Sequence, residues 1–139
     1  MNVQINYLAV LLAAASSMVV GMVWYAKPVF GTMWMKLIKL DDKKAKEGAM
    51  KAITLAFVMS LLTAYVLAHV TYLSFQFFKG SYMIDAITTA FWLWLGISGA
   101  RVVTHDAFEQ RPMKLTALTL GNQLATLVVM GIVLGFFKP

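Results

Sequence analysis

Four long apolar stretches, separated by shorter polar segments, make up most of the chain. They cover about residues 5–25, 50–75, 83–103 and 115–137. At about 1.5 Å per helical residue, each is long enough to cross a hydrocarbon layer about 30 Å thick. The pattern predicts an all-α, polytopic membrane protein whose 139 residues form one transmembrane domain of four helices.

The first polar segment, about residues 26–48, contains a shorter helical pattern. Its apolar residues recur at helical spacing while its lysines fall on other faces: Phe30, Met33, Trp34 and Leu37 against Lys36 and Lys39. This amphipathic pattern predicts a short helix lying in the membrane interface. Asp41 and Asp42 follow it and are expected to cap the next helix, since acidic residues suit the N-terminal end of the helix dipole.

Small residues recur every four positions along the spans and let helix backbones approach closely. The stripes are Ala9, Ala13, Ser17 and Gly21; Ala52, Ala56, Ser60, Ala64 and Ala68; Gly96 and Ala100; Ala117, Gly121 and Ala125; and Gly131 and Gly135. They exceed what one tight four-helix bundle needs, so some are expected to meet other chains. A leucine at Gly21 or Ala64 is expected to disrupt such an assembly.

Composition agrees with a membrane protein, because 60% of the residues are hydrophobic, 13% are charged and the mean hydropathy is +0.74. A soluble domain averages about 45–50% apolar and about 25% charged residues. The first apolar run lacks the basic start of a signal peptide, so a retained first span is expected. The lysines flank the apolar runs, so membrane topology explains the net charge of +6 and no nucleic-acid partner is expected.

The basic residues also predict orientation. The first and third polar segments together hold ten of the twelve: Lys27, Lys36, Lys39, Lys43, Lys44, Lys46, Lys51, Arg101, Arg111 and Lys114. The opposite side has only Lys79 and Lys138. By the positive-inside rule, the first and third segments are expected in the cytoplasm and both termini on the outer side of the cytoplasmic (inner) membrane.

Two groups of polar side chains fall within the spans. Tyr65, His69 and Tyr72 lie close to one line on the second helix, and Asn122 and Gln123 lie roughly two turns inside the fourth. Polar and ionisable groups at membrane depth are costly and often functional, which favours a proton or ligand site. Hydrogen bonds that hold neighbouring helices together explain the same residues. Phe91, Trp92 and Trp94 near the middle of the third span are expected to face lipid, fill a helix interface or line a cavity, and packing is the favoured explanation.

The densest titratable cluster lies in the third polar segment and comprises His105, Asp106, Glu109 and Arg111. A histidine with two carboxylates suits acid–base chemistry or metal binding. A polar turn with internal ion pairs, such as Glu109 with Arg111 or with a lysine of the first polar segment, is the favoured explanation of the cluster. The chain has no cysteine, and no nucleophile or metal-ligand triad is evident. The sequence therefore assigns no catalytic residue, cofactor or metal.

The two segments expected in the cytoplasm share a pattern. FGTMWMKL from Phe30 and FEQRPMKL from Phe108 both read F-x-x-x-x-M-K-L. This match would imply two parallel two-helix repeats related by an axis along the membrane normal.

At the same positions the chain resembles a family of small bacterial membrane proteins known as domain of unknown function 1761. The shared features are N-Y-L-A-V-L from Asn6, Trp24-Tyr25, Phe30-Gly31, Trp34-Met35, Phe108-Glu109, Arg111-Pro112, Lys114-Leu115 and Gly121. The family often has an aromatic pair after Asn-Ala-Gly in the last span, where this chain has Gly121-Asn122-Gln123-Leu124. The resemblance implies a four-helix membrane protein and supplies no activity. It marks as candidate docking residues Trp24, Tyr25, Phe30, Gly31, Trp34, Phe108, Glu109, Arg111, Pro112 and Lys114.

Three functions follow from these patterns. The favoured one is a structural or interaction protein in the lipid bilayer, either a homo-oligomer or an accessory subunit of a larger membrane protein complex. The alternative is a small-solute or proton transporter or channel that acts as an oligomer, with Tyr65, His69, Asn122 and Gln123 as its polar residues. An interfacial enzyme using His105, Asp106 and Glu109 is the third, and it lacks a nucleophile.

Overall fold

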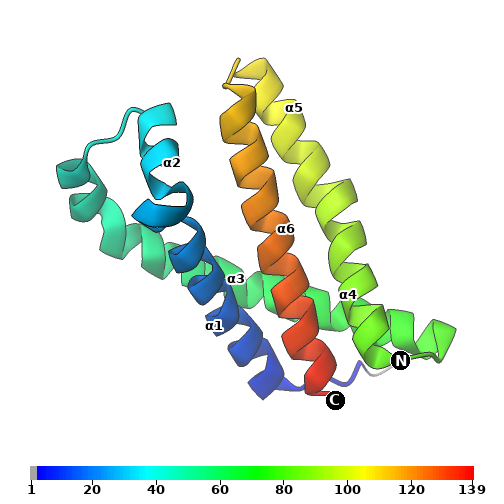
Figure 1. Ribbon diagram of the computed structural model, residues 1–139. Coiled ribbons are helices and arrows are strands. Elements are labelled where there is room, and N and C mark those ends of the chain that lie inside the picture. The colour runs from blue at the N-terminus through cyan, green and yellow to red at the C-terminus, as the bar shows by residue number, and fades with distance from the viewer. Residues whose placement is uncertain (1–2) are drawn as a thin grey trace.

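The computed structural model describes residues 3–139 and is almost entirely helical (Figure 1). The elements in order are α1 (Tyr7–Trp24), η1 (Lys27–Gly31), α2 (Thr32–Leu37), α3 (Asp42–Phe78), α4 (Tyr82–Leu93), η2 (Trp94–Gly99), α5 (Ala100–Phe108) and α6 (Met113–Phe136). The two η segments are π-helical turns, and η2 joins α4 and α5 into one continuous third span. In this part of the chain, four helices are long and apolar enough to cross a membrane, which confirms the predicted fold class.

Two helices extend further than the apolar pattern predicts. α3 begins at Asp42 rather than near residue 50, and the third span continues to Phe108 rather than residue 103. Asp41 is the N-cap of α3, as expected, because its Oδ1 accepts a hydrogen bond of 2.8 Å from the Lys44 amide. The spans were predicted from apolar residues alone. The additional turns are polar, so the helices continue through them beyond the predicted ends.

The helices form one layer with a single crossing helix behind it. In Figure 1, α1, α6 and the α4–α5 span lie side by side, and α3 crosses behind them. α6 packs against both α1 and α4, while α3 contacts α1 and α4. The core between them is built from alanines with a few larger side chains: Ala9, Ala13, Ala14, Ala64, Leu67, Ala90, Leu127, Met130 and Leu134.

The two ends of the bundle carry different segments. Both termini and the α3–α4 turn lie at one end, and Asn6 Nδ2 donates to the Lys138 carbonyl over 3.4 Å there (Figure 1). The η1–α2 segment and the α5–α6 turn lie at the other end. The two polar segments that hold most of the basic residues therefore share one end of the bundle, as segments on one side of a membrane must.

α3 is longer than the other spanning helices and only partly covered. Its 37 residues extend about 55 Å at about 1.5 Å per residue, which exceeds a hydrocarbon layer of about 30 Å. It crosses the other helices obliquely, and residues 51–56 are all exposed. Its second half packs against the bundle through Ala64, Leu67 and Ala68. Residues 51–56 are therefore open to the surroundings of the bundle, whereas Phe57 and Ser60 already pack against it.

The order of elements recurs in the two halves of the chain. Each half has a helix, a π-helical turn that ends at a glycine (Gly31 or Gly99), and a short helix. A residue in the left-handed conformation then precedes the next long helix: Lys39 (φ 54°) or Gln110 (φ 53°). The F-x-x-x-x-M-K-L match does not mark equivalent structures, since its first copy lies in η1 and α2 and its second spans the α5–α6 turn. The element order supports two parallel halves, and the eight-residue match does not.

Candidate functional site

The motif residues after the first span form an aromatic clasp, defined here as Trp24, Tyr25, Phe30, Gly31 and Trp34. The rings of Trp24 and Phe30 have centroids 4.7 Å apart, and those of Tyr25 and Trp34 are 5.0 Å apart. All four aromatic side chains are partly buried. Burial raises the pKa of the Tyr25 hydroxyl above its ordinary value, so the group stays neutral. The clasp therefore fixes the turn between α1 and α2 by ring packing rather than by charge.

Glycine is required at one position of the clasp. Gly31 is buried, and its amide donates to the Ala26 carbonyl over 2.9 Å. A Cβ atom at this position would collide with the Tyr25 carbonyl oxygen and lie 2.9 Å from that of Ala26. The π-helical turn can thus close only around a residue without a side chain.

The clasp also reaches the last span. The edge of the Trp24 ring lies so close to Gly121 of α6 that a Cβ atom there would be only 2.9 Å away. Gly121 is one of the residues on which the family resemblance rests. Matched residues from two distant parts of the sequence therefore meet in one contact between α1 and α6.

The second motif segment ties α5 to α6. Arg111 Nε donates to Glu109 Oε2 over 2.6 Å, and His105 Nε2 lies 3.0 Å from Glu109 Oε1. Asp106 is buried, and its Oδ2 accepts a hydrogen bond of 2.8 Å from Thr116 Oγ1. The Arg111 amide also donates to the Asp106 carbonyl over 2.9 Å. Every charged group of the cluster therefore has a partner inside the turn, including the Glu109–Arg111 pair expected from the sequence.

This network favours a structural role for the cluster over catalysis. The Asp106 carboxylate is occupied by Thr116 and lies 3.8 Å from Arg111 Nε. Within residues 3–139, the His, Asp and Glu side chains form no group of three that could hold a metal ion. By contrast, Phe108, Pro112, Met113 and Lys114 are exposed at the tip of the turn, where they face the bundle's surroundings.

The polar patch predicted on the second span is divided. Tyr65 and His69 lie together on the outside of α3, with ring centroids 4.4 Å apart, and His69 Nδ1 lies 3.2 Å from the Tyr65 carbonyl. Tyr72 is buried instead, because α4 covers this end of α3. Tyr65 and His69 therefore face away from the core, and Tyr72 does not share their surroundings.

The amides of the fourth span lie inside the bundle and lack partners. Asn122 Nδ2 and Gln123 Oε1 are buried without a hydrogen bond, as is Trp24 Nε1 of the clasp. Trp94 lies nearby on the other side of α6 and donates from Nε1 to the Leu120 carbonyl over 3.1 Å. Unsatisfied polar atoms in an apolar environment are costly, so this level of α6 is a polar part of the interior that needs explanation.

One buried acid is absent from the sequence-based site. Asp85, in the first turn of α4, is 8% exposed, and its Oδ2 has no hydrogen-bond partner. Thr71 of α3 is completely buried with an unpaired hydroxyl. In the sequence, Asp85 lies at the start of the third span beside a polar turn, where a charged residue is expected to face solvent. Tyr82 meets Phe75 of α3 edge to face, with ring centroids 5.4 Å apart, and Asp85 follows it by three residues on the same inward face of α4.

Fold and geometry together define an all-α, multi-pass membrane protein with a motif-rich end built around an aromatic clasp and an ion-paired turn. More particularly, the chain belongs to the family described as Protein of unknown function (DUF1761), whose model matches residues 8–135. The match confirms the resemblance drawn from the motif residues. No curated protein and no solved structure matches the chain significantly.

Proposed function

We propose that this protein is a structural membrane subunit that assembles with further copies of itself through the outer face of its third span. The outer face is defined here as Trp92, Gly96 and Ala100, which follow one another at intervals of four residues. All three are exposed, and a Cβ atom built on Gly96 meets nothing within 4 Å. The open space at Gly96 on this exposed face is the observation that carries the proposal.

The other small-residue stripes are mostly used within the chain. Ala9, Ala13 and Ser17 are buried, and Ser17 Oγ donates to Ser60 Oγ over 2.9 Å. A Cβ atom at Gly131 would lie 2.9 Å from the Ala86 carbonyl oxygen. Ala64 is completely buried, so a leucine there would disturb the chain's own core rather than an assembly, contrary to the expectation from sequence. Gly21 is open, but the rest of its stripe is already covered.

A glycine in the middle of a helix needs a compensating contact. A helix-interior glycine is about 1 kcal/mol less favourable than alanine. Among residues 3–139, no close contact at Gly96 requires a glycine or offsets this cost. In a membrane, small residues let a second helix approach closely. Trp92 is 66% exposed and lies four residues before Gly96, so one copy offers both a large side chain and the open space at a glycine. A two-fold dimer, in which the same patch meets itself, suits this arrangement.

The same proposal includes an orientation. The end that carries η1, α2 and the α5–α6 turn holds ten of the twelve basic residues and lies in the cytoplasm by the positive-inside rule. The termini then lie on the opposite side of the cytoplasmic membrane. Cysteines introduced at Lys43 and Lys138 should react with a membrane-impermeant reagent from opposite sides of sealed vesicles, and labelling from the same side would refute this topology.

The test of assembly is native mass spectrometry of the protein released gently from its own membranes. The wild type should appear as a homo-oligomer, and Gly96→Leu should weaken its association by about tenfold or more, equivalent to about 1.4 kcal/mol. Gly21→Leu makes the same change at the open glycine of α1 and should leave association unchanged. A monomer released with one larger membrane protein would refute self-assembly and identify an accessory subunit instead.

A small-solute or proton transporter acting as an oligomer is the second candidate. The unpaired atoms of Trp24, Asn122 and Gln123 favour it, because polar groups within a membrane domain often mark a pathway. Proteoliposomes should then show a flux that Asn122→Leu and Gln123→Leu reduce together. Flux that is indifferent to both substitutions would leave these amides as contacts between helices.

A further inference from the structure

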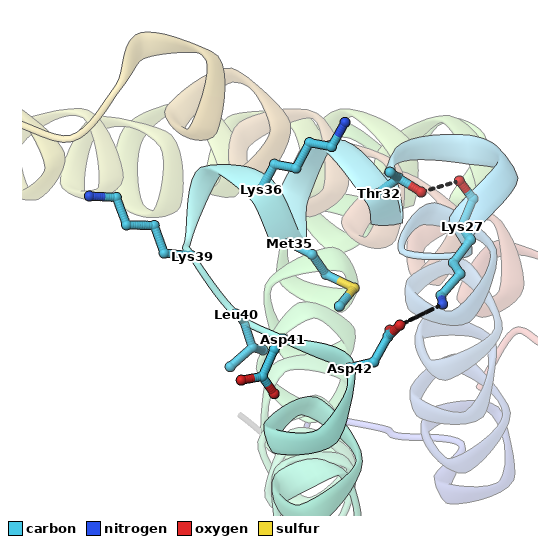
Figure 2. Close-up of a pocket in the computed structure, with 8 residues that line it drawn as sticks. All are labelled: Lys27, Thr32, Met35, Lys36, Lys39, Leu40, Asp41 and Asp42. Atoms are coloured by element: carbon cyan, nitrogen blue, oxygen red, sulfur yellow. Dashed lines mark hydrogen bonds and ion pairs between the residues drawn. The ribbon is translucent and has the colours of Figure 1, made fainter.

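A cavity of about 460 Å³ opens where α2 connects the neighbouring ends of α1 and α3 (Figure 2). Its lining combines lysines, two acids and a few apolar side chains: Lys27, Thr32, Met35, Lys36, Lys39, Leu40, Asp41 and Asp42. The cavity lies at the lysine-rich end of the bundle, a few residues beyond the end of the first span. It does not involve the outer face of the third span and is independent of the proposed assembly.

The two acids of the cavity are already engaged by groups of the chain. Lys27 Nζ lies 3.1 Å from Asp42 Oδ1, and Asp41 Oδ1 accepts a hydrogen bond of 2.8 Å from the Lys44 amide. The Thr32 hydroxyl is also used, because it donates to the Lys27 carbonyl over 3.1 Å.

Two cations of the cavity remain unpaired. Lys36 and Lys39 form no ion pair with any carboxylate of residues 3–139. Figure 2 shows their side chains at the outer edge of the cavity, pointing in different directions and away from the Lys27–Asp42 pair. The cavity therefore has an excess of positive charge on two flexible side chains that are free to turn toward an anion.

The apolar part of the lining restricts the kind of anion. Met35 and Leu40 line the cavity, and Val29 and Met33 are exposed on the adjoining segments. A free phosphate would gain nothing from these side chains. A phospholipid places a phosphate, a glycerol backbone and acyl chains at the same depth as lysines, methionines and leucines next to a membrane span.

We propose that this cavity binds the headgroup of an anionic phospholipid, with Lys36 and Lys39 on the phosphate oxygens and Met35 and Leu40 against the glycerol and upper acyl chains. Lysines next to a membrane span attract anionic lipids, and an ammonium group binds phosphate as a point charge. The Lys27–Asp42 pair closes the inner side of the cavity and holds α1 beside α3. The site thus anchors the connection between the first two spans to the membrane surface.

The test is titration of the purified full-length protein in neutral detergent with phosphatidylglycerol or phosphatidylcholine, with bound lipid counted by native mass spectrometry. The wild type should retain phosphatidylglycerol in preference to phosphatidylcholine. The double variant Lys36→Gln/Lys39→Gln should raise the dissociation constant for phosphatidylglycerol about tenfold or more, as expected for two lysines near an anionic group. All these positions are exposed, so thermal melting should be unchanged.

Lys43→Gln/Lys46→Gln is the matched control, because it removes the same charge from exposed turns of α3 that do not line the cavity. It should change the dissociation constant less than about twofold, since these lysines act only through the weak field of the surface. Asp42→Asn removes a carboxylate and releases Lys27, so it should tighten binding by about two- to fivefold.

Three results would overturn the proposal. Equal losses in the two double variants would indicate diffuse attraction to the lysine-rich end. No loss in Lys36→Gln/Lys39→Gln would remove the site altogether. Displacement of the lipid by glycerol 3-phosphate at a similar concentration would identify a site for a soluble phosphate ester, for which the apolar lining is irrelevant.

Discussion

The two faces of the third span have the same kinds of residue and opposite surroundings. On the inner face, Ala86 and Ala90 lie against Gly131 of α6, and Trp94 donates a hydrogen bond to the Leu120 carbonyl. On the outer face, Trp92 and Gly96 repeat the combination of a tryptophan with a small residue, and both are exposed among residues 3–139. One face completes the bundle and the other remains available.

The difference shows that a stripe of small residues does not by itself identify the helix that packs against it. Such a stripe marks a place where another backbone can come close, but it does not say which backbone. The bundle uses the stripes at Ala9 and Gly131 internally and leaves Gly96 and Ala100 outside. Substitutions on the two faces should therefore affect different quantities, the stability of the single chain on the inner face and the association of chains on the outer face.

The largest effect is expected at the inner contact of α6. Gly131→Leu introduces atoms where the Ala86 carbonyl oxygen would be 2.9 Å and the Ala90 methyl 3.2 Å from a Cβ. The obstructing atoms include backbone, so unfolding in detergent should become easier by about 3 kcal/mol, the upper part of the usual cost of overpacking. Gly96→Leu is the control on the outer face and should not destabilise the single chain, because replacing an open glycine inside a helix should raise the unfolding free energy by up to about 1 kcal/mol. Equal destabilisation by both would remove the distinction between the faces.

The next effect is expected at the turn that joins α5 to α6. Thr116→Val removes the hydroxyl that donates over 2.8 Å to the buried Asp106 carboxylate. A hydrogen bond to a charged group contributes about 1.5–3 kcal/mol, so the unfolding free energy should fall by about 2 kcal/mol. Thr104→Val serves as the control, because the Thr104 hydroxyl is exposed and bonds only to the Ala100 carbonyl of its own helix. Unaltered stability in Thr116→Val would mean that the network does not hold the turn.

A smaller effect separates the two tryptophans. Trp94→Phe removes the indole donor that reaches the Leu120 carbonyl over 3.1 Å, which should cost about 1 kcal/mol of unfolding free energy. Trp92→Phe makes the same chemical change on the outer face and should leave unfolding within about 0.5 kcal/mol of the wild type. Chemical denaturation of monomers in detergent measures both. The assignment of inner and outer tryptophans fails if Trp92→Phe proves the more destabilising.

The spans were predictable because a membrane requires long apolar helices, whose signal depends on length and composition alone. The first polar segment was also predictable, since Phe30 to Leu37 keeps helical spacing and α2 occupies Thr32–Leu37. The start of α3 at Asp42 was not, because polar turns can extend a helix beyond the membrane without changing the apolar pattern. Hydropathy thus predicts where a helix crosses a membrane better than where it ends.

The sites were predictable only where they are local. Glu109 and Arg111 are two residues apart in one turn, and their pairing follows from sequence distance. The separation of Tyr72 from Tyr65 and His69 depends on where α4 begins to cover α3, which no pattern on α3 alone contains. The clasp contact between Trp24 and Gly121 likewise requires the packing of α1 on α6. Helical spacing places residues on one face, and only the tertiary fold decides what that face meets.

The most direct test of the outer face uses the absence of natural cysteine, which lets a single introduced thiol report on contacts between copies. Ala100→Cys, on the outer face, and Ala90→Cys, completely buried on the inner face, are compared by oxidative cross-linking in native membranes. Ala100→Cys is predicted to form a covalent dimer, and Ala90→Cys is predicted to stay monomeric. A monomeric Ala100→Cys protein beside a cross-linked Gly21→Cys protein would contradict the account, because it would move the assembly face from the third span to the first.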